Sequence, residues 1–304
     1  MAVGYETKLR WFDIGAGAFE RRFPGLLLER FGADVVGSYV CPECDVPYPR
    51  SAVDTKELSV EHVPPHGVGG KELLLTCRSC NNRAGKDADV DAINRELVAE
   101  AKRSGPEEPM PVLWHHEGYR IAASIVTVDG KMQLKMVEKA TDPKAIEALR
   151  KGGLIPAGTS LSVEFHRHRF DDMAANASWF RAGFLALTAV CGYRFSCNPA
   201  IEIVKSQIRQ PDKAVIYCFT TILPPEYIVE FKDWSILDMN NPRCTAVVFG
   251  KYAMLYPNAD DMTFYDRVRA DIESGHPPGT FTAQQYHWAG RDPLFDQPED
   301  ATTS

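Results

Sequence analysis

The sequence has no apolar run of the roughly 18 residues or more that a membrane-spanning helix needs. Residues 1–8 also lack the basic start and apolar stretch of a signal peptide. No internal repeat and no low-complexity segment is present. These absences exclude membrane-spanning and repeat classes, and they predict a globular, cytoplasmic protein without a membrane partner.

The sequence also has no excess of basic residues. Its 34 Lys and Arg are outnumbered by 41 Asp and Glu, which gives a formal net charge of −7. Nonspecific affinity for nucleic acid comes mainly from Lys and Arg side chains that neutralise phosphates, so this composition argues against a general polyanion binder. The acidic residues are unevenly placed, however. Residues 292–300 are strongly negative, whereas residues 141–210 hold nine Lys and Arg against six Asp and Glu. A locally basic face therefore remains compatible with the sequence.

Cysteines are few, and half of the eight are scattered through apolar surroundings in the second part of the chain. Such cysteines are typical of buried free thiols in a reducing compartment rather than of a disulfide framework. The scattered cysteines are Cys191, Cys197, Cys218 and Cys244.

The other four cysteines form two Cys-x-x-Cys pairs, Cys41 with Cys44 and Cys77 with Cys80. A two-residue spacer lets both sulfurs of a pair reach one ion at about 2.3 Å, so two such pairs suit tetrahedral Zn²⁺. Four thiolates leave no open position for water or substrate. The pattern therefore predicts a structural zinc, either as a purely structural knuckle or as the support of a catalytic site.

The chain between the pairs carries Glu61-His62 and then a Pro- and Gly-rich loop, and Asn81-Asn82 follow the second pair. In this combination the chain resembles the HNH nucleases, the ββα-metal superfamily, in their zinc-stapled form. The resemblance covers roughly residues 38–92. The matching residues are Cys41, Cys44, Glu61, His62, Pro65, Gly69, Gly70, Leu73, Leu74, Leu75, Cys77, Cys80 and Asn81.

The resemblance implies a catalytic role for the residues around His62. His62 would be the general base that takes a proton from water attacking a phosphodiester; the alternatives are a further zinc ligand or a loop histidine. Glu61 would hold a catalytic Mg²⁺ or Mn²⁺ together with an asparagine, Asn81 or Asn82, the other asparagine being a helix cap. His66 is either a metal or phosphate contact or an exposed loop residue.

Three basic residues, Arg78, Arg83 and Lys86, lie where the helix of the family meets the phosphate backbone. They are either phosphate contacts or a solvated helix face. One position departs from the family pattern, because Glu72 stands where an asparagine usually braces the catalytic loop. A carboxylate there accepts hydrogen bonds but cannot donate them as an amide does.

Local patterns predict an α+β protein with three parts: an N-terminal helical arm (1–37), the zinc-stapled module (38–103) and a larger α+β domain (110–304) with a mostly antiparallel sheet. Asp129-Gly130 is a strong hairpin signal, and Ser104 to Pro109 form the best linker. Helices are expected at 17–31, 87–103, 142–152, 171–190 and 262–274, and strands at 119–128, 131–137, 161–170, 214–222, 227–231 and 244–255.

The function expected from the resemblance is metal-dependent hydrolysis of DNA, with restriction or phage defence as a fitting setting. The larger domain would select the substrate, a protein partner or a second copy of the chain. The alternative is a catalytically inactive zinc-binding module for nucleic acid or protein. Hydrolysis of RNA or of a nucleotide is a third hypothesis.

Overall fold

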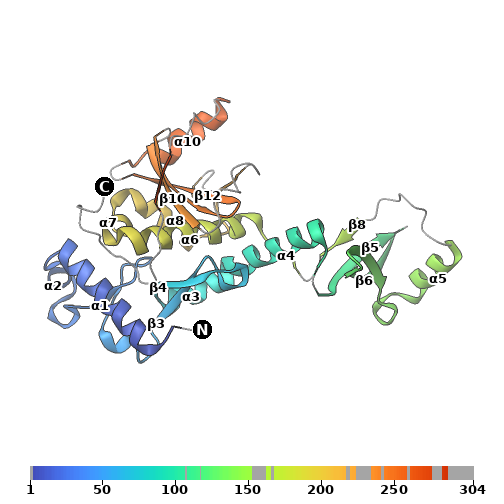
Figure 1. Cartoon of the computed structure of the whole chain (residues 1–304), viewed down its shortest axis with the longest axis horizontal. Coiled ribbons are helices and arrows are strands. Elements are labelled where there is room, and N and C mark those ends of the chain that lie inside the picture. The colour runs from blue at the N-terminus through green and yellow to red at the C-terminus, as the bar shows by residue number, and fades with distance from the viewer. Residues whose placement is uncertain are drawn as a thin grey trace. The chain divides into compact units, whose positions relative to one another are not determined.

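The computed structural model describes residues 3–106, 108–116, 118–152, 162–165, 168–216, 220–223, 234–240, 243–258, 261–275 and 283–286. Helices and strands alternate irregularly, and every strand pairing in these ranges is antiparallel. The predicted α+β class is thereby confirmed (Figure 1). No helix in these ranges is both long and apolar enough to cross a membrane.

The chain divides into two compact units, and one is interrupted in sequence by the other. The first unit comprises residues 1–92 and 173–304, and the second comprises residues 93–172. This division differs from the predicted one, which placed a boundary at 104–109 and kept 110–304 together. The physical reason is the apolar helix that begins at Asp172, which shares one hydrophobic core with the N-terminal part of the chain.

The first unit contains most of the regular structure. Its helices are α1 (Tyr5–Arg22), α2 (Leu26–Phe31), α3 (Arg78–Ala84), α6 (Asp172–Cys191), α7 (Tyr193–Ser196), α8 (Glu202–Arg209) and α10 (Phe264–Glu273). Its strands are β1 (Tyr39–Val40), β2 (Pro47–Tyr48), β3 (Leu58–Val63), β4 (Lys71–Cys77), β9 (Thr220–Ile222), β10 (Trp234–Asn240), β11 (Arg243–Phe249), β12 (Tyr252–Pro257) and β13 (Ala283–Tyr286).

The N-terminal arm, where a helix was expected at 17–31, is two helices: α1 begins already at Tyr5, and residues 23–25 separate it from α2. Gly25 has φ of 73°, a left-handed conformation that suits glycine, and it stands directly before α2. The apolar face of α1 buries Trp11, Phe12 and Phe19 in the core of the first unit. The arm is therefore part of the first unit rather than a separate extension.

Helix α6 is the centre of this core. Fifteen of its residues are buried, because its apolar side chains surround the helix axis. Trp179 stacks on Tyr252 with ring centroids 4.5 Å apart, and Phe180 stacks on Tyr256 at 4.9 Å. These contacts join α6 to strand β12 of a five-stranded sheet with the order β13-β10-β11-β12-β9.

The sheet also corrects the strand prediction for residues 244–255. Instead of one strand, β11 and β12 pair with each other in register from Cys244 opposite Pro257 to Phe249 opposite Tyr252. Gly250, with φ of 53°, begins the turn between them. Of the strand expected at 214–222, residues 220–222 form β9 and residues 214–216 are not a strand. The expected strand at 227–231 lies outside the described residues. Among the scattered cysteines Cys244 is buried as predicted, whereas Cys191 is exposed.

The second unit is a four-stranded sheet with the order β7-β6-β5-β8, and it has its own small core. The predicted hairpin at Asp129-Gly130 is confirmed, with φ of 51° and 71° at these two residues. Asp142 caps α5 by accepting a hydrogen bond from the amide of Lys144 at 2.8 Å. Its elements are β5 (Met110–His116), β6 (Tyr119–Val128), β7 (Lys131–Met136), α5 (Pro143–Gly152), β8 (Ser162–Glu164) and most of α4 (Val90–Ser104).

The loop between β3 and β4 depends on one glycine. A Cβ atom at Gly70 would lie 1.4 Å from the carbonyl oxygen of Pro64, so any side chain there forces the backbone to move. We expect Gly70→Ala to lower the free energy of unfolding by about 2 kcal/mol. The matched control is Gly85→Ala, in a helical turn with nothing within 4 Å, which should stabilise by about 0.5–1 kcal/mol. Denaturant unfolding of both variants measures the difference, and equal effects would contradict the steric argument.

Candidate metal centre and adjoining site

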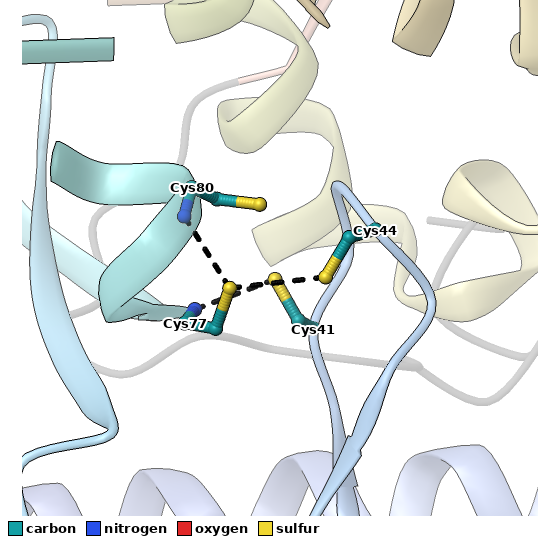
Figure 2. A group of neighbouring side chains, drawn as sticks. All are labelled: Cys41, Cys44, Cys77 and Cys80. Atoms are coloured by element: carbon teal, nitrogen blue, oxygen red, sulfur yellow. Dashed lines mark hydrogen bonds between the residues drawn. The ribbon is translucent and has the colours of Figure 1, made fainter. Parts of the chain in front are cut away.

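The two cysteine pairs come together as the spacing predicted. Cys41 directly follows β1 and Cys44 lies in the following turn, while Cys77 ends β4 and Cys80 lies in the first turn of α3 (Figure 2). The four sulfur atoms all lie within 4.8 Å of one another, and the sulfurs of Cys44 and Cys77 are 3.8 Å apart. A tetrahedron with Zn–S bonds of 2.3 Å has edges of about 3.8 Å. The cluster can therefore hold a metal ion such as zinc.

Hydrogen-bond donors surround these sulfurs. The amide of Cys77 donates to Cys41 Sγ at 3.3 Å, and the amide of Cys80 donates to Cys77 Sγ at 3.4 Å (Figure 2). The Nη2 of Arg83 donates to Cys80 Sγ at 3.4 Å. Such donors orient metal ligands and offset the negative charge of thiolates. Arg83, predicted as a phosphate contact, is half-buried and directs one of its amino groups toward the cluster.

The thiols of the four cysteines differ in pKa. Burial raises the pKa of Cys41 well above its ordinary value. Hydrogen bonding from Cys41, and then from Cys44, lowers the pKa of Cys77. A metal ion binds thiolates, so it must displace the protons that remain on the cluster, and acidification works against binding.

The chain segment that carries the predicted catalytic residues has the order strand, strand, helix: β3, β4 and α3. Strands β3 and β4 pair from Leu58 opposite Cys77 to Val63 opposite Lys71, with a register shift between Glu61 and His62. The shift leaves Leu73 as an extra residue on β4. Glu61 is buried, whereas the next residue, His62, is half-buried.

Glu61 is engaged inside the protein. Its Oε2 accepts a hydrogen bond from Arg181 Nη2 at 2.5 Å and another from Thr76 Oγ1 at 3.1 Å. Arg181, on α6, also donates from Nε and Nη2 to Glu43 Oε1, at 3.1 and 2.7 Å. Burial opposes the charged guanidinium, but Glu43 and Glu61 outweigh it and hold the pKa of Arg181 well above its ordinary value. A catalytic cation would have only the other oxygen of Glu61 to bind.

Arg181 and Glu43 were not among the predicted site residues. The signal that points to Arg181 is its place between Phe180 and Phe184 in an apolar helix, because arginine is almost never fully buried unless it is paired. The sequence gives no sign of which carboxylates pair with it.

The two histidines of the loop lie next to each other. Their rings are 5.0 Å apart between centroids, with an interplanar angle of 86°. His66 is exposed and His62 half-buried. Across the strand pair His62 is opposite Glu72, whose Oε2 accepts a hydrogen bond from the amide of Val3 at 2.7 Å. The carboxylate at this position thus anchors the N-terminal segment.

The two asparagines after Cys80 differ in environment. The Nδ2 of Asn81 donates to Ser59 Oγ at 3.1 Å and to the carbonyl of Val60 at 3.2 Å, so Asn81 ties α3 to β3. Asn82 is exposed, as are Arg78 and Lys86 on the same stretch. Of the two predicted cation ligands, Asn81 is the one that the structure brings to the strand of Glu61 and His62.

The contacts of Asn81 predict a measurable difference between the two asparagines. Asn81→Ala removes two hydrogen bonds between α3 and β3, and we expect it to lower the free energy of unfolding by about 1–2 kcal/mol. Asn82→Ala is the matched control and should change it by about 0.5 kcal/mol or less, because that side chain is exposed. Denaturant midpoints of the metal-loaded proteins test this; an equal loss from both would show that the Asn81 contacts contribute nothing.

A pocket of about 230 Å³ lies elsewhere in the first unit, between the N-terminal helices and the segment around α8. Among its lining residues is Lys205, which is 2% exposed and donates to both carboxylate oxygens of Asp45, at 2.6 and 2.7 Å. None of the predicted catalytic or cation-binding residues lines it. The pocket therefore adds nothing to the chemistry predicted around His62.

No protein-family model, no curated protein and no solved structure matches this chain. The family that the sequence resembles is therefore not shown by comparison. What stands on the structure is an α+β protein with a four-cysteine group that can hold a metal ion beside a strand-strand-helix segment.

Proposed function

We propose that this protein is a metal-dependent endonuclease of the HNH type that hydrolyses DNA phosphodiester bonds, with a structural zinc at the four cysteines. The observation that carries the proposal is the chain order β3, β4, α3, with the cysteine cluster at the junction of β4 and α3. His62 lies on β3, and Asn81 braces β3 from α3. One segment thus presents a partly exposed imidazole on a fixed support.

The chemistry asked of His62 is proton transfer. A neutral imidazole accepts a proton from water as that water attacks phosphorus, and its half-buried position lets water reach it while the strand holds its backbone. The exposed side chains of Arg78 and Lys86 would position the phosphate backbone of the substrate. In this scheme the zinc has four protein ligands and takes no part in the reaction.

A second cation, Mg²⁺ or Mn²⁺, would stabilise the charge that develops on the phosphate when it is bound. The residues for it are Glu61, through its Oε1, and Asn81, through its Oδ1. The contacts of Arg181 and Thr76 on the other oxygen of Glu61 would fix the carboxylate, as hydrogen bonds commonly do for metal ligands.

The burial of Glu61 also favours a second candidate, a zinc-stapled module that binds nucleic acid or protein without hydrolysis. An arginine on the carboxylate offsets the negative charge that attracts a cation. The two candidates differ in one outcome, because only the nuclease cuts.

The deciding experiment incubates the purified full chain with supercoiled plasmid, linear duplex, single-stranded DNA and RNA. Each substrate is tested with Mg²⁺, with Mn²⁺ and with EDTA. Cleavage of DNA that needs the added cation supports the nuclease. Binding of DNA in a fluorescence anisotropy titration, with no cleavage of any substrate, would replace it with the binding module.

A further inference from the structure

A buried ion-pair bridge joins three parts of the first unit that are distant in sequence. It consists of Glu43, Arg181 and Glu61, and is called the Arg181 bridge below. The three residues are 1%, 4% and 4% exposed. Two nitrogens of Arg181 converge on one oxygen of Glu43, and Nη2 also contacts Glu61. This geometry uses the planar fork of the guanidinium, which a lysine cannot reproduce.

The partners of Arg181 come from two functionally distinct segments. Glu43 lies between Cys41 and Cys44, within the loop that carries half of the metal cluster. Glu61 directly precedes His62 on β3. Arg181 itself belongs to α6, which also packs in the apolar core and against the five-stranded sheet. One side chain therefore connects the metal loop, the strand of His62 and the core helix.

The bridge contains two negative charges and one positive charge, so it carries an excess negative charge. Two carboxylates share one guanidinium, and Glu43 Oε2 is buried without a hydrogen-bond partner in the described part of the structure. If one carboxylate is neutralised, a balanced pair remains. If both are neutralised, a buried arginine is left with no opposite charge, which is the most costly arrangement of the three.

We propose that Arg181 is a positioning residue that couples the four-cysteine metal site to the strand carrying His62. A change at Glu61, which lies outside the metal loop, is transmitted through Arg181 to Glu43 and loosens the cluster. A change at Glu43 is transmitted in the opposite direction to His62. The coupling itself does not require catalysis, and its consequence for cleavage rests on the proposed function.

The test is a double-mutant cycle on the full chain, with Glu43→Gln, Glu61→Gln and the double variant. The measured quantity is the rate of zinc loss to excess chelator, followed with a metal-sensitive dye. Each single variant should accelerate zinc loss modestly. The double variant should accelerate it by about tenfold or more beyond the product of the single effects, because only it leaves Arg181 unpaired.

The matched control cycle replaces Glu61→Gln by Asp13→Asn, which removes the partner of exposed Arg50 on the surface of the same unit. Glu43→Gln and Asp13→Asn should combine as a simple product. If Glu43→Gln and Glu61→Gln also combine as a simple product, the coupling is refuted.

The second measurement keeps the test decisive if the double variant does not fold. The imidazole signals of His62 in a ¹H–¹³C spectrum should move in Glu43→Gln and in Arg181→Lys, but not in Asp13→Asn. Unmoved His62 signals in Glu43→Gln would overturn the proposal. Neither measurement uses DNA, so a failure of the coupling and a failure of the nuclease are separate results.

Discussion

Stripping the bound metal from the purified protein is expected to abolish the fold around the cysteine cluster. Cys41, Cys77 and Cys80 are 0%, 1% and 2% exposed, and without a cation their sulfurs crowd together in an apolar setting. Structural zinc contributes about 10–16 kcal/mol in small zinc-binding peptides. This free energy is larger than the total free energy of unfolding of most domains, so its loss should unfold the cluster. Because β4 and Cys77 belong to the shared core, the loss should extend into α6.

The measurement pairs metal analysis by mass spectrometry with circular dichroism. Wild type should carry about one zinc per chain. Cys41→Ser and Cys77→Ser should lose the metal and much of the ordered structure, whereas Cys191→Ser, at an exposed cysteine outside the cluster, should keep both. Zinc occupancy should also fall as the solution is acidified, since protons compete for the thiolates. Folded, metal-loaded Cys41→Ser and Cys77→Ser proteins would show that the four cysteines are not a metal site.

His62→Ala is expected to lower the rate of DNA cleavage by on the order of 10²-fold or more, because it removes the proposed general base. Zinc content, melting temperature and DNA affinity should stay close to wild type. The reason is positional: His62 is half-buried at the end of β3, and the metal cluster and the Arg181 bridge hold the surrounding fold without it.

His66→Ala is the matched control for this prediction. His66 is the exposed member of the histidine pair and shares the loop with His62, so its removal changes the same surface. It should affect cleavage far less. If both variants cut as wild type does, neither imidazole is the base; if both lose activity equally, the base cannot be assigned to His62.

The local elements were predictable because their signals lie within a few residues. Asp129-Gly130 places two residues of positive φ at a hairpin turn, and Asp142 caps α5 with its own carboxylate. The Cys-x-x-Cys spacing likewise brings two sulfurs to one point. The two-residue turn that begins at Gly250 was missed because apolar residues continue on both sides of it, which disguises two strands as one.

The long-range features were not predictable from one sequence. The pairing of Glu61 with Arg181 spans 120 residues, and no periodicity or spacing encodes which carboxylate meets which guanidinium. That α6 shares a core with the N-terminal part was unpredictable for the same reason. An apolar helix indicates that it is buried, but its sequence does not indicate which segments bury it. Both features matter at the site, because α6 carries Arg181, and the pairing with Arg181 holds Glu61 in the interior.

The sequence separation within the Arg181 bridge also sets an order of events during synthesis. Arg181 follows Glu61 by 120 residues and Glu43 by 138. Ribosomes add about 5–20 residues per second, so the arginine is made roughly 6 s or more after both carboxylates and roughly 5 s or more after Cys80, the last of the four cysteines. A nascent chain can thus load its metal while Glu43 and Glu61 are still hydrated. Helix α6 then brings Arg181 as the last member of the bridge, and when it docks the two carboxylates pass from water into the core of the first unit.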